Sequence, residues 1–292
     1  MKPARFDYLR PADLPAALTA LRDDAGAKPV SGGQSLGPML NLRLARPSLL
    51  VHVGALPELR AVEEGPDAIV YGAAITHAEF EDGAVPDATP GFLARIAGGI
   101  AYRAVRNRGT IGGSLAHADP AADWPTTLAA LGARVRLARV AAHTGHQAGH
   151  TGLTGHLTAL IEPREIPVED FITGAFETAL GEGEIVTGVA VPRCHDTARF
   201  GYRKSCRKVG EFAEAMCAVL YDPARGVVRL AVGATEARQL VIQDARFILQ
   251  DIEKIDEVLH EAGLADDPAS FRLRRAVIRQ AIAALEPESL SA

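Results

Sequence analysis

Ser31-Gly32-Gly33-Gln34-Ser35-Leu36 is the stretch that does most to decide the fold, because a short strand runs here into a turn with two adjacent glycines. Lys28-Pro29-Val30 leads into the turn, and the segment from Pro11 to Arg22 places apolar residues at helical spacing, with Asp13 as its start signal. Such a turn can direct backbone N–H groups, unobstructed by Cβ atoms, at an anion such as pyrophosphate. Paired glycines are also common in ordinary turns, so this turn alone decides little.

A second turn repeats that chemistry. Thr110-Ile111-Gly112-Gly113-Ser114 is preceded by Arg106-Asn107-Arg108-Gly109 and followed by Asp119-Pro120-Ala121-Ala122-Asp123. Two glycine turns can embrace a diphosphate from both sides, and an acidic residue beyond them suits a ribose diol. Neither turn matches the phosphate loop of nucleotide hydrolases or the Gly-x-Gly-x-x-Gly fingerprint. The pair therefore predicts a different cofactor cradle.

Elsewhere the chain alternates strand-like and helix-like stretches, which is typical of an α/β or α+β protein. We expect strands near residues 49–53, 69–73, 134–137, 184–191, 213–222 and 227–233, and helices near 76–80, 92–103, 124–131, 253–262 and 271–285. Pro192 marks a predicted domain boundary, and the last hundred residues are expected to form a separate small α+β unit.

Composition excludes several classes of protein. The chain has 292 residues, enough for two or three subdomains, with 48% hydrophobic and 23% charged residues, so disorder is excluded. The net charge of -5, without a continuous basic face, leaves no basis for nucleic-acid binding. The three cysteines match neither a metal-ligand pair nor a disulfide frame, and no stretch predicts export or a membrane span. A reduced, cytoplasmic chain fits best.

The two turns, the arginine-containing lead-in and the Asp-Pro-x-x-Asp tail resemble the FAD-binding medium subunits of the xanthine dehydrogenase and carbon monoxide dehydrogenase family of molybdenum hydroxylases. The resemblance covers nearly the whole chain. It extends from Phe6 through Asn41-Leu42-Arg43, Pro167 to Phe171 and Glu184-Ile185-Val186 to Tyr202-Arg203-Lys204.

The resemblance implies an α+β fold: an FAD-binding domain of the vanillyl-alcohol-oxidase (PCMH) type over residues 1–190, with subdomains of about 1–55 and 56–190, then a C-terminal domain over 193–292. It also implies that Asp123 meets the ribose side of FAD and that Val186 and Lys204 lie near its flavin and adenine portions. The residues that it assigns to the diphosphate are Ser31, Gly32, Gly33, Gln34, Ser35, Thr110, Ile111, Gly112, Gly113 and Ser114.

Each of these side chains also has a purely structural interpretation. A cation at Lys204 would stabilise an anionic reduced flavin, but most lysines are solvated. Asp123 can equally be the N-cap of the helix that follows. Arg106 and Arg108 can steady the second turn or lie in solvent. Phe212 stands where some relatives carry an aromatic hydroxyl residue, so one hydrogen bond near the flavin is expected to be missing.

The segment from Ala141 to His156 departs from the family pattern and is expected to be an exposed loop. It contains His143, His146, His150 and His156 among threonines and glycines. These could bind zinc or nickel adventitiously. A fixed metal site, however, also needs hydrogen-bonding groups that orient the ligands, and the surrounding threonines and glycines do not indicate them. Nor does the segment contain the cysteines that an inserted iron-sulphur cluster requires. We therefore predict no metal site on this chain.

Three functions remain open. The preferred one is electron relay, in which a large partner subunit carries the molybdenum cofactor, a small partner carries two 2Fe-2S clusters, and FAD on this chain passes electrons to an external acceptor. A dimer of heterotrimers is the family expectation. The alternatives are a stand-alone FAD-dependent oxidase or reductase, and a metal-responsive module built on the His-rich segment. The sequence identifies neither the substrate nor the acceptor.

Overall fold

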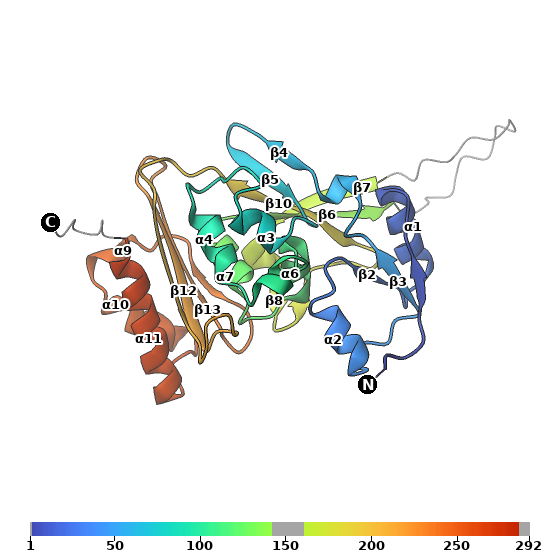
Figure 1. The fold of residues 1–292 in the computed structure, drawn as a ribbon. Coiled ribbons are helices and arrows are strands. Elements are labelled where there is room, and N and C mark those ends of the chain that lie inside the picture. The colour runs from blue at the N-terminus through green and yellow to red at the C-terminus, as the bar shows by residue number, and fades with distance from the viewer. Residues whose placement is uncertain (1, 142–160, 286–292) are drawn as a thin grey trace, which may run out of the picture.

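In the computed structural model, which describes residues 2–141 and 161–285, three larger β-sheets follow one another along the chain, a two-stranded ribbon is attached to the second, and helices pack between the sheets (Figure 1). The mixture of sheets and segregated helices confirms the α+β prediction.

The first sheet is parallel, with the order β1-β3-β2. Its strands are β1 (Asp7–Leu9), β2 (Lys28–Val30) and β3 (Leu49–His52), and the connections contain α1 (Leu14–Asp23) and α2 (Leu36–Asn41). Helix α1 begins as predicted, because the Asp13 carboxylate accepts a 2.8 Å hydrogen bond from the backbone N–H of Ala16. Its buried Leu18 packs against Val51 of β3, which fixes the helix on the sheet.

The second sheet has the order β4-β5-β10-β6-β7 and is antiparallel. Its central strand comes from late in the sequence and returns between two earlier ones. The strands are β4 (Val62–Glu64), β5 (Ala68–Gly72), β6 (Arg134–Val140), β7 (Ile161–Pro167) and β10 (Ile185–Pro192); the 3-10 helix η1 (Pro57–Leu59) precedes β4, and the ribbon of β8 (Ile172–Gly174) and β9 (Glu177–Thr178) follows β7.

Six helices accompany this sheet, and the second glycine turn lies beside Ala73, just after the end of β5. They are α3 (His77–Glu81), α4 (Phe92–Gly98), α5 (Arg103–Arg106), α6 (Ile111–His117), α7 (Asp123–Leu131) and α8 (Val168–Phe171). The single helix predicted over residues 92–103 is wrong: α4 ends at Gly98, and a new helix starts only at Arg103. Two consecutive glycines, Gly98 and Gly99, interrupt it because glycine loses the most backbone entropy in a helix.

The third sheet is antiparallel, with the order β11-β12-β13-β14. Its strands are β11 (Arg199–Ser205), β12 (Ala215–Asp222), β13 (Val227–Gly233) and β14 (Leu240–Ile242), followed by α9 (Arg246–Gln250), α10 (Lys254–Glu261) and α11 (Pro268–Ala283). The sheet is covered on both faces, by α7 and by α11 (Figure 1).

Helix α7 is the central element, since every one of its residues is buried. Along β12 the side chains alternate between two cores: Leu220 joins the core around α7, whereas Cys217 and Val219 join the core beneath α11. The C-terminal sheet is thereby packed directly onto the helix that follows the second glycine turn. No helix among the described residues is long and apolar enough to cross a membrane.

Candidate functional site

The first glycine turn follows β2 and lies directly against the segment that leads into the second. A Cβ on Gly32 would stand 1.8 Å from the carbonyl oxygen of Arg108, so only glycine fits there. Gly33 has a φ of +71°, in the left-handed region that glycine adopts without strain. Gly32 is therefore required because the two segments approach closely, and Gly33 is required because the turn needs a left-handed residue.

The backbone N–H groups of this turn have no acceptor in the part of the chain that the structure describes. Among residues 2–141 and 161–285, the amides of Gly32, Gly33, Gln34 and Ser35 donate no hydrogen bond to backbone or side chain. The Ser31 hydroxyl is buried and also lacks a partner within the described chain. Buried polar groups without partners are costly, and successive amides of this kind form an anion-binding concavity. The first turn thus presents donors for an acceptor outside the chain.

The second turn is built differently. The amides of Ile111 and Gly112 donate to the carbonyls of Ile75 and Ala73 at 3.0 Å each, and the amide of Gly113 donates to the Thr110 hydroxyl, which caps α6. The two turns are therefore not equivalent. The second turn satisfies these donors within the protein, and its glycines let the backbone pack closely against a neighbouring segment.

Gly112 shows that close approach most clearly, because a Cβ on it would lie 2.4 Å from the Ala73 Cβ. Val186 is buried beside this contact, at a bulge in β10 after which Thr187 accepts a 3.0 Å hydrogen bond from Ala73. Ser114, whose side chain is half-buried, follows on the first turn of α6. The fold thus brings together the two turns and Val186.

Asp123 and Lys204 form a second cluster. Lys204 Nζ lies 2.8 Å from Asp123 Oδ1 and 3.2 Å from the carbonyl oxygen of Gly99, and the Tyr202 hydroxyl donates to the same Asp123 oxygen at 2.5 Å. The Asp123 and Lys204 side chains are 8% and 10% exposed. The interpretation of Lys204 as a solvated lysine is therefore wrong, and its charge is offset by a neighbouring carboxylate.

The N-cap interpretation of Asp123 is also wrong. Ala122 is the N-cap of α7, and Asp123 is the first residue of the helix. The Asp123 carboxylate accepts hydrogen bonds from β11 instead of capping the helix. Burial, with the Asp123 carboxylate beside it, raises the pKa of Tyr202 well above its ordinary value, so the phenol stays protonated and donates. Tyr202 was not predicted to have a role, although Tyr202 and Lys204 are two apart on a strand and so share a face.

A buried histidine links the two clusters. The backbone N–H of His77 donates to the carbonyl oxygen of Gly109, just before the second turn, and Trp124 Nε1 donates to His77 Nδ1 at 3.0 Å. Burial, together with the positive charge of Arg106, lowers the pKa of His77 to about 4. The imidazole is therefore neutral at pH 7 and accepts a hydrogen bond from Trp124, the residue next to Asp123. Sequence reasoning missed this contact, which spans 47 positions.

Arg106 and Arg108 have different environments. Arg106 is 12% exposed; it pairs with Glu81 through Nε at 2.7 Å and caps the carbonyls of Ile100 and Ala101. The solvated interpretation of Arg106 is thus wrong, and its partner Glu81 was not identified from the sequence. These Arg106 hydrogen bonds lower the pKa of the Glu81 carboxyl. Arg108 is exposed and donates from Nε to the Gly32 carbonyl at 3.3 Å.

The remaining candidates lie apart or outside the described chain. Phe212 is 63% exposed on the loop between β11 and β12. Cys217 is buried and Cys194 and Cys206 are half-buried, all three as free thiols. The segment holding His143, His146, His150 and His156 falls outside the described residues; within them, no group of three or more histidines, cysteines and carboxylates is placed to hold a metal.

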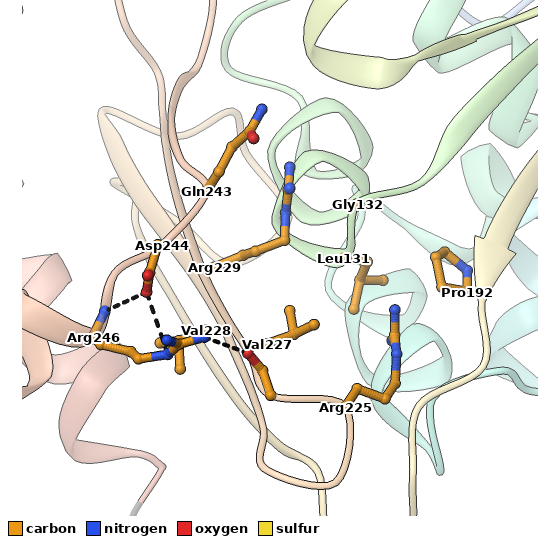
Figure 2. Close-up of a pocket in the computed structure, with 11 residues that line it drawn as sticks. Leu131, Gly132, Pro192, Arg225, Val227, Val228, Arg229, Gln243, Asp244 and Arg246 are labelled. Atoms are coloured by element: carbon orange, nitrogen blue, oxygen red, sulfur yellow. Dashed lines mark hydrogen bonds and ion pairs between the residues drawn. The ribbon is translucent and has the colours of Figure 1, made fainter.

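A cavity of about 280 Å³ opens elsewhere, between the end of α7 and the β13–β14 region (Figure 2). Arg225, Arg229 and Arg246 line it. Each already faces a carboxylate: Asp222 at 3.7 Å, Glu169 at 2.8 Å and Asp244 at 3.5 Å, respectively. None of the predicted cofactor residues lies there, and its arginines already face carboxylates.

The residues around the glycine turns fit a dinucleotide diphosphate. The fit rests on the four amides and the Ser31 hydroxyl, which have no acceptor in the described chain. It also rests on the close approach of Gly32 to the Arg108 carbonyl, which a side chain at position 32 would prevent. FAD carries such a diphosphate. Helix α6, which starts with the second turn, packs against α7, the helix that begins with Asp123.

Comparisons with known proteins agree with this fit. Residues 4–148 match the family described as the FAD binding domain in molybdopterin dehydrogenase. The chain is 31% identical over 295 residues to the nicotine 6-hydroxylase medium subunit of Paenarthrobacter nicotinovorans, covering 97% of this chain and 96% of that one. It is 34% identical to the carbon monoxide dehydrogenase medium chain of Hydrogenophaga pseudoflava, covering 75% and 70%.

Solved structures show the same similarity in three dimensions. Carbon monoxide dehydrogenase from Hydrogenophaga pseudoflava, lacking the Mo-pyranopterin moiety, matches with a TM-score of 0.81 and 28% identity over 98% of both chains. Quinoline 2-oxidoreductase from Pseudomonas putida 86 matches with a TM-score of 0.79 and 29% identity, again over 98% of both chains.

Proposed function

The chain belongs to the FAD-binding medium subunits of the molybdenum hydroxylases, and from that premise we propose that it is their electron-relay component. It carries FAD and receives electrons from 2Fe-2S clusters on a small partner subunit, while a large partner subunit carries the molybdenum cofactor and transforms the substrate. The electrons leave through FAD to an external acceptor. We further propose a cytoplasmic dimer of heterotrimers.

The observation that supports this proposal most directly is the first glycine turn. Four successive amides and a buried hydroxyl lack acceptors within the described chain, beside a second turn that leaves no room for side chains. Such a site suits a phosphate-containing cofactor. FAD, when bound, supplies the ability to exchange two electrons with partners that carry one or two.

The individual residues divide the binding between them. We assign Ser31 to Ser35 to the diphosphate as donors and Thr110 to Ser114 to its other side as a close-fitting wall. Val186 borders the second turn. Asp123 and Lys204, as a pair joined by Tyr202, orient the ribose side and the flavin side of the cofactor. Because the Asp123 carboxylate offsets the Lys204 charge, we expect this pair to fix geometry more than to raise the flavin potential.

Domain boundaries follow from the same proposal. An FAD-binding domain would span residues 1–190, with subdomains of about 1–55 and 56–190, and a C-terminal domain would span 193–292. The grouping of strands into sheets over residues 7–52, 62–192 and 199–242 supports this division. The units share a core, because Ala218 and Leu220 of the third sheet pack in the same cluster as Trp124 and Leu128 of α7.

The test is isolation of the complex that forms on this chain in its host. We expect FAD to be released by mild acid, with a small iron-sulphur subunit and a large molybdenum-bearing subunit in equal amounts. Reduction of the FAD by substrate should require the large subunit. A lone yellow protein whose flavin is bleached directly by an organic substrate would replace this function with that of a stand-alone oxidase.

A further inference from the structure

The carboxyl ends of the three parallel strands β1, β3 and β2 meet at one edge, where open parallel sheets bind ligands. Each strand ends beside a residue able to contact an anion. Arg10 follows the last residue of β1, His52 is the last residue of β3, and Ser31 follows β2. The first glycine turn starts from this edge.

Side-chain contacts join Arg10 and His52 at this edge through Tyr8. Tyr8 stacks on the His52 ring with centroids 6.0 Å apart, and the Arg10 guanidinium carbon lies 5.9 Å from the Tyr8 centroid. From the other side, Arg108 donates through Nε to the Gly32 carbonyl at 3.3 Å. Burial, and then Arg10 and Arg108, lower the pKa of His52, as expected where positive groups surround an imidazole.

No carboxylate offsets these positive charges within residues 2–141 and 161–285, where neither Arg10 nor Arg108 has an ion-pair partner within 4.0 Å. Nearby arginines differ: Arg103 and Arg106 both pair with Glu81. Positive groups brought together without a counter-charge repel one another, and a bound anion would replace that repulsion with attraction. Arginine side chains are also well suited to phosphate oxygens.

We propose that Arg10 and Arg108, with the His52 imidazole near both, form a charged clamp on the diphosphate of FAD, in addition to the backbone donors of the first turn. This inference rests on the proposed function and deepens it. The clamp contributes charge where the turn contributes directional amides. It therefore selects the diphosphate and makes binding depend on salt.

The test uses the full-length chain freed of FAD, with flavin fluorescence as the readout. Arg108→Gln and Arg10→Gln should each raise the Kd for FAD about tenfold or more, the usual loss for a hydrogen bond to a charged group. Arg46→Gln is the matched control, because Arg46 is exposed and its Nε donates to the carbonyl oxygen of Arg43. It removes the same charge and should leave the Kd unchanged.

Two further measurements separate charge from local structure. Arg108→Lys keeps the charge but loses the guanidinium, so it should recover part of the affinity lost in Arg108→Gln; equal weakness of both variants would indicate a structural role and overturn the clamp. Inorganic pyrophosphate should compete with FAD on the unaltered chain, and less well on Arg108→Gln.

The outcomes also distinguish the inference from its premise. An unaltered chain that binds FAD tightly while Arg10→Gln and Arg108→Gln match it would overturn the clamp and leave the proposed function standing. An unaltered, folded chain that binds no FAD would overturn both.

Discussion

Lys204 Nζ lies 2.8 Å from Asp123 Oδ1, which joins β11 of the C-terminal sheet to the first turn of α7 across 81 positions of sequence. The Tyr202 hydroxyl donates to the same oxygen, so one carboxylate receives two donors from one face of one strand. The contact couples the helix that follows the second glycine turn to the sheet packed on it. It is therefore both a candidate cofactor contact and a connection between two parts of the fold.

Lys204→Met should lower the free energy of unfolding by about 3 kcal/mol, because it leaves a buried carboxylate with only the Tyr202 hydroxyl. The double variant Lys204→Met with Asp123→Asn should lose less than the sum of the two single variants, since neither charge remains unpaired. Denaturant unfolding of the four proteins measures both quantities. Additive losses would show that the two side chains do not interact.

Gly32→Ala should weaken FAD binding by at least tenfold and lower stability by about 2 kcal/mol, because the new Cβ would meet the Arg108 carbonyl oxygen at 1.8 Å. Gly37→Ala is the matched control: a Cβ there has nothing within 4 Å, and the residue lies in α2. Alanine at 37 should be neutral or slightly stabilising. Flavin fluorescence and thermal unfolding test both changes, and equal behaviour of the two variants would contradict the close approach at Gly32.

His77 should make the protein less stable as the pH falls from about 6.5 to about 4. Its folded pKa of about 4 lies below the unfolded value of 6.5, so in this window the unfolded chain takes up a proton that the folded chain does not. The loss at the lower end is on the order of 3 kcal/mol. Above pH 6.5 both states are neutral and His77 contributes no pH dependence.

His77→Asn keeps an acceptor for Trp124 and should flatten this part of the stability profile, whereas His260→Asn, at an exposed position, should not. Unfolding in denaturant at several pH values gives the profile. An unchanged slope in His77→Asn would mean that another group is responsible.

Arg229→Met should cost about 2 kcal/mol, because Arg229 Nη2 lies 2.8 Å from Glu169 and caps the Ala129 carbonyl at the end of α7 at 3.1 Å. Arg246→Met, on the same cavity wall (Figure 2), should change stability by less than about 0.5 kcal/mol, since Arg246 and Asp244 are 57% and 62% exposed. Thermal unfolding compares them. Similar losses of stability in both variants would show that burial does not determine how much these two ion pairs contribute.

Much of the fold could be predicted from the sequence, because the signals are local. The Asp13 cap, the apolar spacing of α1 and the strand over residues 227–233 depend on neighbours a few residues away, and each was found where predicted. The helix predicted over residues 92–103 failed because the pattern of apolar residues continued through two glycines that interrupt the backbone. The glycine turns and the arginines beside them were likewise visible as residue types.

The sequence by itself determined which residue types are present to hold a diphosphate and where the chain turns. Tertiary structure alone decided how each is used. Among the described residues, the first turn finds no acceptor for its amides, whereas the second donates its amides to Ile75 and Ala73, which belong to a segment more than thirty residues earlier. Likewise, Lys204 is a buried partner of Asp123 only because β11 packs against α7. Side-chain charge and hydrogen-bond partners depend on distances between segments far apart in sequence, and only the packed fold sets those distances.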